Sequence, residues 1–474
     1  MVIGTQSGAG KSLIALVLCR MLSNLGFRVA PYKAVNMSLN SVVTDTGEEM
    51  ARAQWTQAVA ARVNPAARFN PVLMKPERNG SSQIVIMGRS QGSFPYDRNS
   101  GLLENMGKKV VMETLNDLAS QNDFVVIEGM GSPSEINLQD HDLANTFIME
   151  NFPVECILVG NIYSGGVFAS IYGTIALSRA SEKIKWLIVN NLAGSPEILG
   201  DGVPKLEKLT GRKVLGIVPH FGIKLPGEDS MDYGTSPGGG VWVVRYPHME
   251  NYSETDSLFF NGVGFRYVSR SEDLRGCDLL VLPGSKDVSA DMEFLRQSGI
   301  DQMIYRARSL KIPILGICGG FQMLGNIIED PEGVESRGII RGMGLLNVGT
   351  EFASKKTTRR VNYSAIPATL NGVSGEGYEI HFGNVNNHGE KPLFVTDHGT
   401  EGSIASDGLV LGSNIHGLLD NDRFVSALLG KEVKFSYSLE DEIDRVTRFV
   451  TSHADFSPIL DPDARNHGPD LPPK

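Results

Sequence analysis

Apolar residues along the chain gather in short runs that alternate with stretches of helical periodicity. In the first half, each of several runs is long enough for one buried strand: 1–3, 124–127, 156–159, 186–189 and 213–218. Helical periodicity follows the first run over residues 13–25. Strands and helices that alternate in this way predict a mostly parallel sheet covered on both faces. We therefore expect a doubly wound α/β domain.

The same pattern returns after a turn-rich segment, Ser236-Pro-Gly-Gly-Gly240, which predicts a domain boundary. Apolar runs at 241–246 and 277–282 then begin a second α/β domain. Residues 423–450 have the pattern of two amphipathic helices. The expected domains are therefore 1–235 and 241–450, and we expect residues 451–474, which end in a segment rich in Pro, Asp and Gly, to be flexible.

A strand followed by a sharp glycine turn surrounds Cys318. Residues 314–317 have the pattern of a buried strand, two glycines follow the cysteine, and 321–324 begin a helix. A nucleophile at such a corner projects from the sheet beside the free backbone N–H groups of the helix N-terminus. Those groups can lower the pKa of a thiol and hold an oxyanion. Cys318 is therefore the candidate nucleophile, although a cysteine here could also simply pack in the core.

A histidine ends the strand-like run Val410-Leu-Gly-Ser-Asn-Ile-His416. A nucleophilic thiol needs a base, and the amine that leaves later needs an acid, so His416 is the candidate partner of Cys318. A lone histidine is more often structural, and His381 is a rival base that could instead be structural or face the substrate. Asp420 would orient His416 only if the loop after the strand turned back.

A glycine-rich loop, Gly4-Thr-Gln-Ser-Gly-Ala-Gly-Lys-Ser12, lies between the first predicted strand and helix. Such a loop aims backbone N–H groups at phosphates and adds a lysine charge and a hydroxyl for Mg²⁺. Five residues, rather than the usual four, separate its first and last glycines. The loop predicts an ATP site whose candidate residues are Gly4, Thr5, Gly8, Gly10, Lys11 and Ser12.

Two further charged residues follow predicted strands of the first domain. Glu128 comes directly after the run 124–127, and a carboxylate at this edge of a parallel sheet faces the phosphate loop. It could hold Mg²⁺ together with Ser12, or it could cap a helix. Lys33 follows a short strand and could reach an ATP phosphate or a substrate carboxylate, although a single lysine is more often a surface residue.

Composition narrows the class of protein. A chain of 474 residues is long enough for two or more domains. Its net charge of −10 argues against nucleic acid or an anionic membrane as the main partner. The four cysteines have no disulfide or metal spacing, which suits a reducing cytosol. No apolar run reaches membrane-spanning length and no signal peptide is evident, so we expect a cytoplasmic protein.

The turn Gly316-Ile-Cys-Gly-Gly320, with His416 downstream, resembles the nucleophile turn of triad-type (class I) glutamine amidotransferases. The resemblance implies glutamine as a substrate and an oxyanion hole formed by the N–H of Gly319 with that of Gly284 or Ser285. Many of these enzymes place a glutamate two residues after the histidine, where this chain has Leu418.

Longer segments resemble cobyric acid synthases and occur in the same order. Among them are Tyr32-Lys-x-x-Asn-Met-x-Leu-Asn-Ser41, Asn70-Pro-Val-Leu-Met-Lys-Pro76, Tyr96 and the segment from Glu128 to Leu138. That family uses glutamine and ATP to amidate the b, d, e and g carboxylates of (adenosyl)cobyrinic acid a,c-diamide in cobalamin biosynthesis. The resemblance implies a corrin acid as substrate and, for the first domain, a phosphate-loop fold similar to dethiobiotin synthetase.

Three segments depart from the pattern of that family. Where it usually has Asp-Gly-Gly-Glu, this chain has Thr46-Gly-Glu-Glu49, which leaves neighbouring Asp45 as a second candidate ligand for Mg²⁺. Arginine and lysine residues are also replaced within 163–166 and 190–195. An arginine that binds a carboxylate through two hydrogen bonds has no equivalent in serine or alanine. Either the substrate differs, or other residues supply the charge, or activity is weak.

Two other functions stay open at this point. One is an amidotransferase that acts on another tetrapyrrole acid, of the a,c-diamide synthase type. The other is a non-catalytic ATP switch of the ParA kind, which would leave Cys318 and His416 without a role. The sequence does not decide the oligomeric state, and a homodimer is one alternative.

Overall fold

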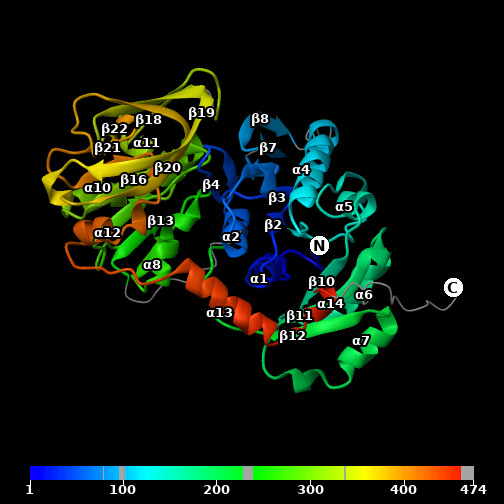
Figure 1. Ribbon diagram of the computed structural model, residues 1–474. Helices are drawn as coiled ribbons and strands as arrows, with labels where there is room; N and C mark the ends of the chain where they lie inside the picture. The colour runs from blue at the N-terminus through cyan, green and yellow to red at the C-terminus, as the bar shows by residue number, and fades with distance from the viewer. Residues whose placement is uncertain (78–79, 96–100, 102, 228–238, 336–337, 461–474) are drawn as a thin grey trace.

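The computed structural model describes residues 1–77, 80–95, 101, 103–227, 239–335 and 338–460. Tyr96, residues 236–238 of the predicted boundary and the end of the predicted tail lie outside this part of the chain. Two α/β domains lie side by side (Figure 1). No helix in the described ranges is long and apolar enough to cross a membrane.

A parallel sheet forms the centre of the first domain, in the order β2-β9-β1-β10-β11-β12, with an isolated bridge from Val2 to Glu128 joining β9 to β1. Neighbouring residues of β1 point to opposite faces, since Val2 packs with Ile14 of helix α1 and Ile3 packs with Ile171 of helix α6. Helices therefore cover both faces, which confirms the doubly wound fold. The strands are β1 (Val2–Gly4), β2 (Val29–Tyr32), β9 (Phe124–Ile127), β10 (Cys156–Asn161), β11 (Ile184–Leu192) and β12 (Lys213–Pro219). The helices are α1 (Lys11–Asn24), α2 (Arg52–Ala61), α4 (Lys108–Gln121), α5 (Thr146–Asn151), α6 (Val167–Leu177) and α7 (Gly202–Thr210).

Two small sheets extend the first domain toward the second (Figure 1). One has the order β3-β6-β7-β8, and the other is the hairpin of β4 and β5. Tyr378 and Ile380 of the second domain belong to the same buried cluster as Val42 and Met50 of this hairpin, so the two domains share a core. The strands are β3 (Val35–Met37), β4 (Ser41–Val43), β5 (Glu49–Ala51), β6 (Val72–Pro76), β7 (Ser81–Ile86) and β8 (Arg89–Pro95).

The second domain has a sheet in the order β14-β13-β15-β16-β24-β23, in which only β23 is antiparallel to its neighbour. A second, mixed sheet, β18-β17-β19-β20-β25, packs beside it and contains a long antiparallel pair, β19 and β20. The first sheet comprises β13 (Val241–Val244), β14 (Phe265–Val268), β15 (Leu279–Leu282), β16 (Ile314–Ile317), β23 (Ser403–Ile404) and β24 (Val410–Ser413). The second comprises β17 (Ile327–Asp330), β18 (Gly338–Arg341), β19 (Val348–Ala365), β20 (Ser374–Asn387) and β25 (Ile415–His416), with β21 (Phe394–Thr396) and β22 (Gly399–Glu401) at its side.

The helices of the second domain are α8 (Asp256–Phe260), α9 (Val288–Gln297), α10 (Ile300–Ser309), α11 (Gly319–Leu324) and α12 (Asp422–Leu429). A 3₁₀ turn, η7 (Tyr252–Thr255), precedes α8. The apolar core of this domain lies between its first sheet and these helices and continues to the mixed sheet.

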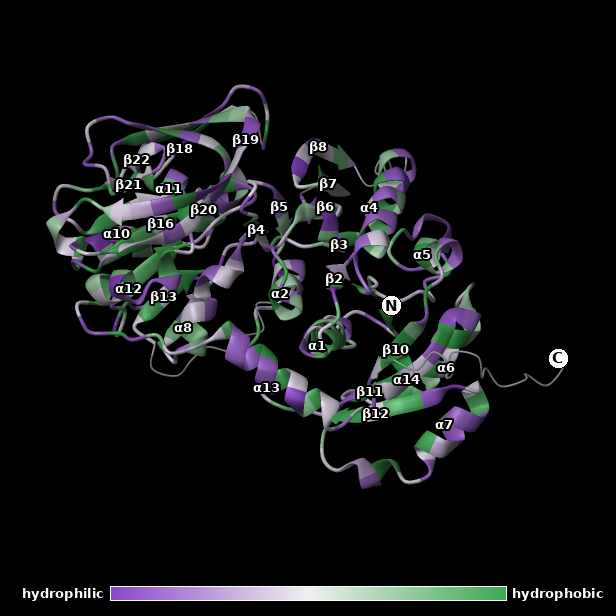
Figure 2. Ribbon diagram, in the orientation of Figure 1, coloured by the Kyte–Doolittle hydropathy of each residue, from purple (hydrophilic) through white to green (hydrophobic). Residues whose placement is uncertain are grey.

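The last long helix, α13 (Leu439–Thr451), returns to the first domain (Figure 1). Its buried residues Ile443, Val446 and Val450 share a core with α1, and Figure 2 shows hydrophobic and hydrophilic residues mixed along it. The range predicted for the second domain thus includes a helix that packs on the first. Phe456 is buried in the same core and α14 (Ser457–Leu460) follows, so residues 451–460 are folded where the sequence predicts a flexible tail.

Candidate active site

Cys318 lies at a tight corner between β16 and α11. Its backbone has φ 51° and ψ −112°, a strained conformation for a residue with a side chain. The tight corner requires glycine at its neighbouring positions because larger residues would clash. A Cβ on Gly320 would lie 2.0 Å from the Leu282 carbonyl oxygen, and one on Gly316 would lie 2.6 Å from Leu324. The Cys318 N–H donates to the Ser413 carbonyl oxygen at 2.8 Å. The predicted nucleophile turn is therefore present, held by the sheet on one side and the helix on the other.

His416 lies beside Cys318 and is fully buried. Its Nδ1 is 2.8 Å from Oε1 of Glu254, and its ring also interacts with the Cys318 side chain. Burial alone would lower the pKa of His416, but the bonds and charges of Cys318 and Glu254 raise it to about 10. His416 is therefore an imidazolium at neutral pH, and its positive charge lies beside the Cys318 side chain.

Glu254 is a functional residue that the sequence did not reveal. It lies on η7, 162 residues before His416, and the backbone N–H of Gly417 also donates to its carboxylate at 3.1 Å. Leu418 occupies the position where many related enzymes have this glutamate, and Asp420 instead accepts a hydrogen bond from Ser257. Because Glu254 contacts His416 from a turn that is distant in the chain, no short sequence motif contains both residues.

The two candidate oxyanion segments meet at Cys318. A Cβ on Gly319 would lie 2.7 Å from the backbone nitrogen of Ser285, so these backbone groups are adjacent. A Cβ on Gly284 would lie 3.5 Å from Cε1 of His416. The geometry brings Gly284, Ser285 and Gly319 together, and their role as oxyanion donors stays a prediction.

A cavity of about 20 Å³ adjoins Cys318 and is lined in part by Gln322, Glu335 and His381. Burial lowers the pKa of His381 to about 4, so its ring is neutral, and its Nδ1 lies 2.8 Å from the Gly383 carbonyl oxygen. Its Nε2 has no hydrogen-bond partner among the described residues. The structure thus pairs His416, rather than His381, with the carboxylate and the thiol, and leaves His381 facing the cavity.

The phosphate loop lies at the start of α1, as predicted. The Lys11 side chain folds back over the loop, and its Nζ donates to the carbonyl oxygens of Gln6 and Gly131 at 3.0 and 3.1 Å. Gly8 and Gly10 have φ of 71° and 104°, the left-handed region that favours glycine. Asn190, in one of the segments that depart from the family pattern, donates to the Ala9 carbonyl oxygen at 3.0 Å and supports the loop.

Glu128 and Lys33 join this loop. Ser12 Oγ donates to Glu128 Oε1 at 2.8 Å, and Lys33 Nζ lies 2.9 Å from the same oxygen. Gln57 donates to the other carboxylate oxygen at 2.5 Å. A hydroxyl and a carboxylate in contact are ligands that suit Mg²⁺, and Lys33 supplies a positive charge at the same place.

Asp45 does not join this group. Its side chain is 75% exposed and lies 3.6 Å from Arg360 of β19, in the second domain. The β4–β5 hairpin carries this loop to the domain interface, away from Ser12 and Glu128. The prediction that Asp45 is a metal ligand with these two residues therefore does not match the arrangement.

Comparison with known proteins gives the family. The model of the CobB/CobQ-like glutamine amidotransferase domain matches residues 240–424, and that of the CobQ/CobB/MinD/ParA nucleotide binding domain matches residues 1–222. A probable cobyric acid synthase of Picrophilus torridus is 46% identical, over 97% of this chain and 98% of its own length. This chain belongs to the cobyric acid synthase family. A probable cobyric acid synthase of Thermoplasma acidophilum is 43% identical over 97% and 98% of the two chains, and the cobyric acid synthase of Photorhabdus laumondii is 38% identical over 96% of each.

Replacement of Glu254 by Gln is expected to lower kcat/KM for glutamine hydrolysis about 10- to 100-fold, the effect of losing a charged hydrogen bond of about 1.5–3 kcal/mol. Without the carboxylate charge the pKa of His416 falls from about 10, so the imidazolium supports the thiolate less well. The pH profile of Cys318 alkylation by iodoacetamide should therefore move to higher pH. The matched control is Asp420→Asn, which should keep the normal profile. An unchanged profile in Glu254→Gln would contradict the assignment of Cys318, His416 and Glu254 as a triad.

Proposed function

We propose that this chain uses glutamine and ATP to convert (adenosyl)cobyrinic acid a,c-diamide to cobyric acid, by amidation of the b, d, e and g carboxylates in cobalamin biosynthesis. The observation that carries the proposal is that one chain of this family holds a Cys318–His416–Glu254 triad and a phosphate loop in two domains with a shared core. The first site would release ammonia, and the second would activate the carboxylate that receives it.

In the glutamine half-reaction, Cys318 Sγ attacks the side-chain amide carbon of glutamine. The carbonyl oxygen becomes an oxyanion held by backbone N–H groups at Gly319 and at Gly284 or Ser285. His416 gives a proton to the leaving nitrogen, which departs as ammonia and leaves a thioester on Cys318. Water, deprotonated by His416, then attacks the thioester and releases glutamate. Glu254 holds the ring throughout through Nδ1.

In the ATP half-reaction, a substrate carboxylate oxygen attacks the γ-phosphorus of ATP, giving an acyl phosphate and ADP. Ammonia then attacks the acyl carbon and inorganic phosphate leaves, because phosphate is a far better leaving group than hydroxide. The loop N–H groups and Lys11 would bind the phosphates, and Lys33 would hold the carboxylate or a phosphate near Glu128.

Mg²⁺ belongs to the proposal as the metal of ATP. The contact of Ser12 Oγ with Glu128 Oε1 at 2.8 Å fits such an ion, since both are hard oxygen donors at the edge of the phosphate loop. When bound, the ion would neutralise phosphate charge. The cytoplasmic location and the homodimer considered from the sequence stay predictions.

The function is tested by incubating the purified chain with glutamine, ATP and cobyrinic acid a,c-diamide, in adenosylated and unadenosylated form, and following the corrin by mass spectrometry. Four successive carboxyl-to-amide changes are expected, each requiring ATP. An enzyme of the a,c-diamide type would instead convert cobyrinic acid and stop after two. A chain that consumes neither glutamine nor corrin acid would contradict the proposal and favour an ATP switch.

A further inference from the structure

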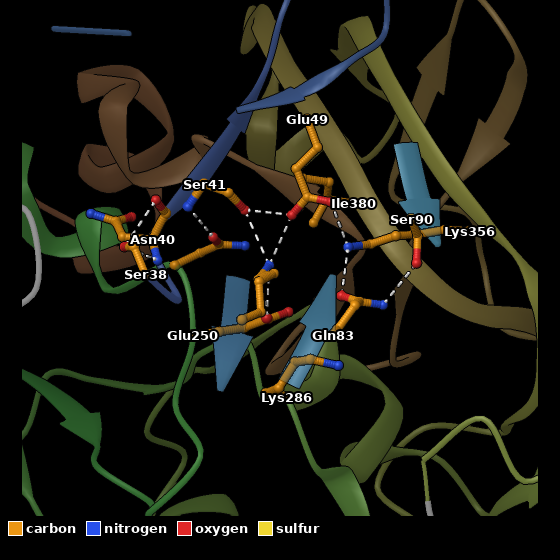
Figure 3. Close-up of polar contacts among 12 residues, drawn as sticks. Ser38, Asn40, Ser41, Glu49, Gln83, Ser90, Glu250, Lys286, Lys356 and Ile380 are labelled. Atoms are coloured by element: carbon orange, nitrogen blue, oxygen red, sulfur yellow. Dashed lines mark hydrogen bonds and ion pairs between the residues drawn. The ribbon is translucent and has the colours of Figure 1, made fainter. Parts of the chain in front are cut away.

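Four buried charges lie at the domain interface, and Figure 3 labels three of them, Glu49, Glu250 and Lys356. Glu49 and Lys75 come from the first domain, and Glu250 and Lys356 come from the second. Lys75 Nζ lies 3.0 Å from Glu49 Oε1 and 3.2 Å from Glu250 Oε2, and Lys356 Nζ lies 2.7 Å from Glu49 Oε2. We call these four residues the interface cluster. Within it, Lys75 and Glu49 each pair with one charge of their own domain and one of the other.

The interface cluster is almost sealed from solvent. The exposed fractions of the side chains are 0% for Lys75, 1% for Glu49, 8% for Glu250 and 9% for Lys356. Burial opposes charge on Glu49, but Lys356 and Lys75 hold its pKa well below the usual range. Desolvation makes such a cluster a weak source of stability, whereas its fixed geometry can specify one arrangement of the parts that it joins.

One part that the interface cluster joins is the segment that carries Glu254, the carboxylate bonded to His416. Glu250 begins this segment and its backbone N–H donates to the carbonyl oxygen of Gly284, in the candidate oxyanion turn, at 3.0 Å. Glu254 lies four residues further on. Glu250 therefore contacts the turn beside Cys318 and lies in the same short segment as the carboxylate bonded to His416.

The next residue, Asn251, is held by the first domain as well. Its backbone N–H donates to the Leu39 carbonyl oxygen at 3.2 Å, and its side-chain oxygen accepts from the N–H of Ser41 at 3.1 Å. Its Nδ2 lies 3.5 Å from Nε2 of His416. Residues 39–41 of the first domain thus hold the backbone beside the triad.

Tyr378 supplies a second link between the same residues and the histidine. Its ring stacks on the His416 ring with centroids 5.2 Å apart and planes 14° from parallel. Its hydroxyl donates to the Ser41 carbonyl oxygen at 3.3 Å, while Ser41 Oγ accepts from Lys75 at 3.1 Å. The face of His416 and its carboxylate partner are therefore both tied to Ser41 and the interface cluster.

We propose that the first domain positions the glutaminase triad: Lys75, Glu49 and residues 39–41 hold the segment 250–254 and Tyr378 in the arrangement that makes Cys318 and His416 reactive toward glutamine. These first-domain residues are positioning residues, since none of them touches the reacting thiol. The inference rests on the proposed hydrolysis of glutamine at Cys318. It makes that hydrolysis depend on a docked first domain.

The test replaces Lys75 with Met, which keeps the length of the side chain and removes its charge. Lys75 pairs with both Glu49 and Glu250 and donates to Ser41 Oγ. We expect kcat for glutamine hydrolysis to fall at least about tenfold, the effect of losing a single charged hydrogen bond. KM should change less than about twofold, because Lys75 does not line the Cys318 cavity. The pH profile of Cys318 alkylation should move to higher pH. Lys75→Arg should recover most of the rate, and Lys109→Met, which changes an exposed lysine, is the control.

Amidation with added ammonium is the check on folding, and it should fall by no more than about twofold in Lys75→Met. Tyr378→Phe is a second variant that removes only the hydroxyl bonded to Ser41 and leaves the ring in place. It should lower kcat about threefold and move the alkylation profile in the same direction, as expected for one neutral hydrogen bond of about 0.5–1.5 kcal/mol.

Either of two outcomes would overturn the inference. One is that Lys75→Met and Tyr378→Phe both hydrolyse glutamine at the normal rate with an unchanged alkylation profile. The other is that the glutamine and ammonium activities of Lys75→Met fall in parallel without a shift of the alkylation profile, which is the result for a purely structural cluster. Failure of the proposed glutamine hydrolysis, on which the inference rests, is distinguishable, since the unsubstituted chain would then hydrolyse no glutamine at all.

Discussion

Substitution of Cys318 by Ser is expected to abolish glutamine-dependent amidation and to spare amidation with added ammonium. Oxygen in place of sulfur keeps the shape of the corner, but a hydroxyl is far less acidic than a thiol and forms no ion pair with the His416 imidazolium. The rate with glutamine should therefore fall by about 10³-fold or more. Ammonium enters the reaction after this step, so only the first of the two half-reactions is lost.

The measurement is the rate of corrin amide formation with each nitrogen source at saturating ATP. Cys277→Ser is a matched control, because Cys277 is also buried and the same atom is exchanged away from the triad. It should keep both activities. If Cys318→Ser lost the ammonium activity as well, the two half-reactions could not be assigned to separate sites.

Substitution of Lys11 by Met should have the complementary effect and remove amidation with both nitrogen sources. Lys11 is the only charged side chain of the loop from Gly4 to Ser12, and its Nζ donates to the Gln6 carbonyl oxygen of that loop. Removing a charge aimed at phosphates that gain negative charge in the transition state costs about 10²–10³-fold. The acyl phosphate would then not form, whatever the source of ammonia.

ATP consumption that depends on the corrin acid is the direct readout for Lys11→Met. Lys205→Met is the control, since Lys205 is an exposed lysine that pairs with Asp201, four residues earlier in the chain. Normal amidation with ammonium in Lys11→Met would show that this loop does not carry the ATP chemistry. Together with Cys318→Ser, the variant separates loss of ammonia supply from loss of carboxylate activation.

The features that the sequence predicted are those encoded by short segments. The turn at Cys318 and the phosphate loop each need a strand, glycines and a helix start in immediate succession, so their residues occur together in the chain. Glu128 could be found because it follows an apolar strand of the parallel sheet, whose carboxyl ends meet at one edge. His416 could be found because it ends the apolar run 410–416, which the structure divides into β24 and the short antiparallel strand β25.

The features that the sequence did not reveal depend on contacts between distant segments. Glu254 reaches His416 from a 3₁₀ turn with no motif of its own, and the glutamate that related enzymes place near the histidine is absent. Asp45 was predicted from its neighbours in the chain, but the hairpin that carries it points to Arg360. The interface cluster follows from the docking of two domains, which local periodicity does not encode.

The return of α13 has a consequence for how the polypeptide is organised. Since this helix packs on α1 after the whole amidotransferase unit has been completed, the first domain is discontinuous, and the second is in effect inserted between two of its parts. Both ends of the insertion are therefore anchored to one scaffold. A single cut between the domains would leave Ile443, Val446 and Val450 on the fragment that contains the second domain, although they pack in the core of the first. Expressing the two domains separately therefore requires two cuts and the joining of the two parts of the first domain.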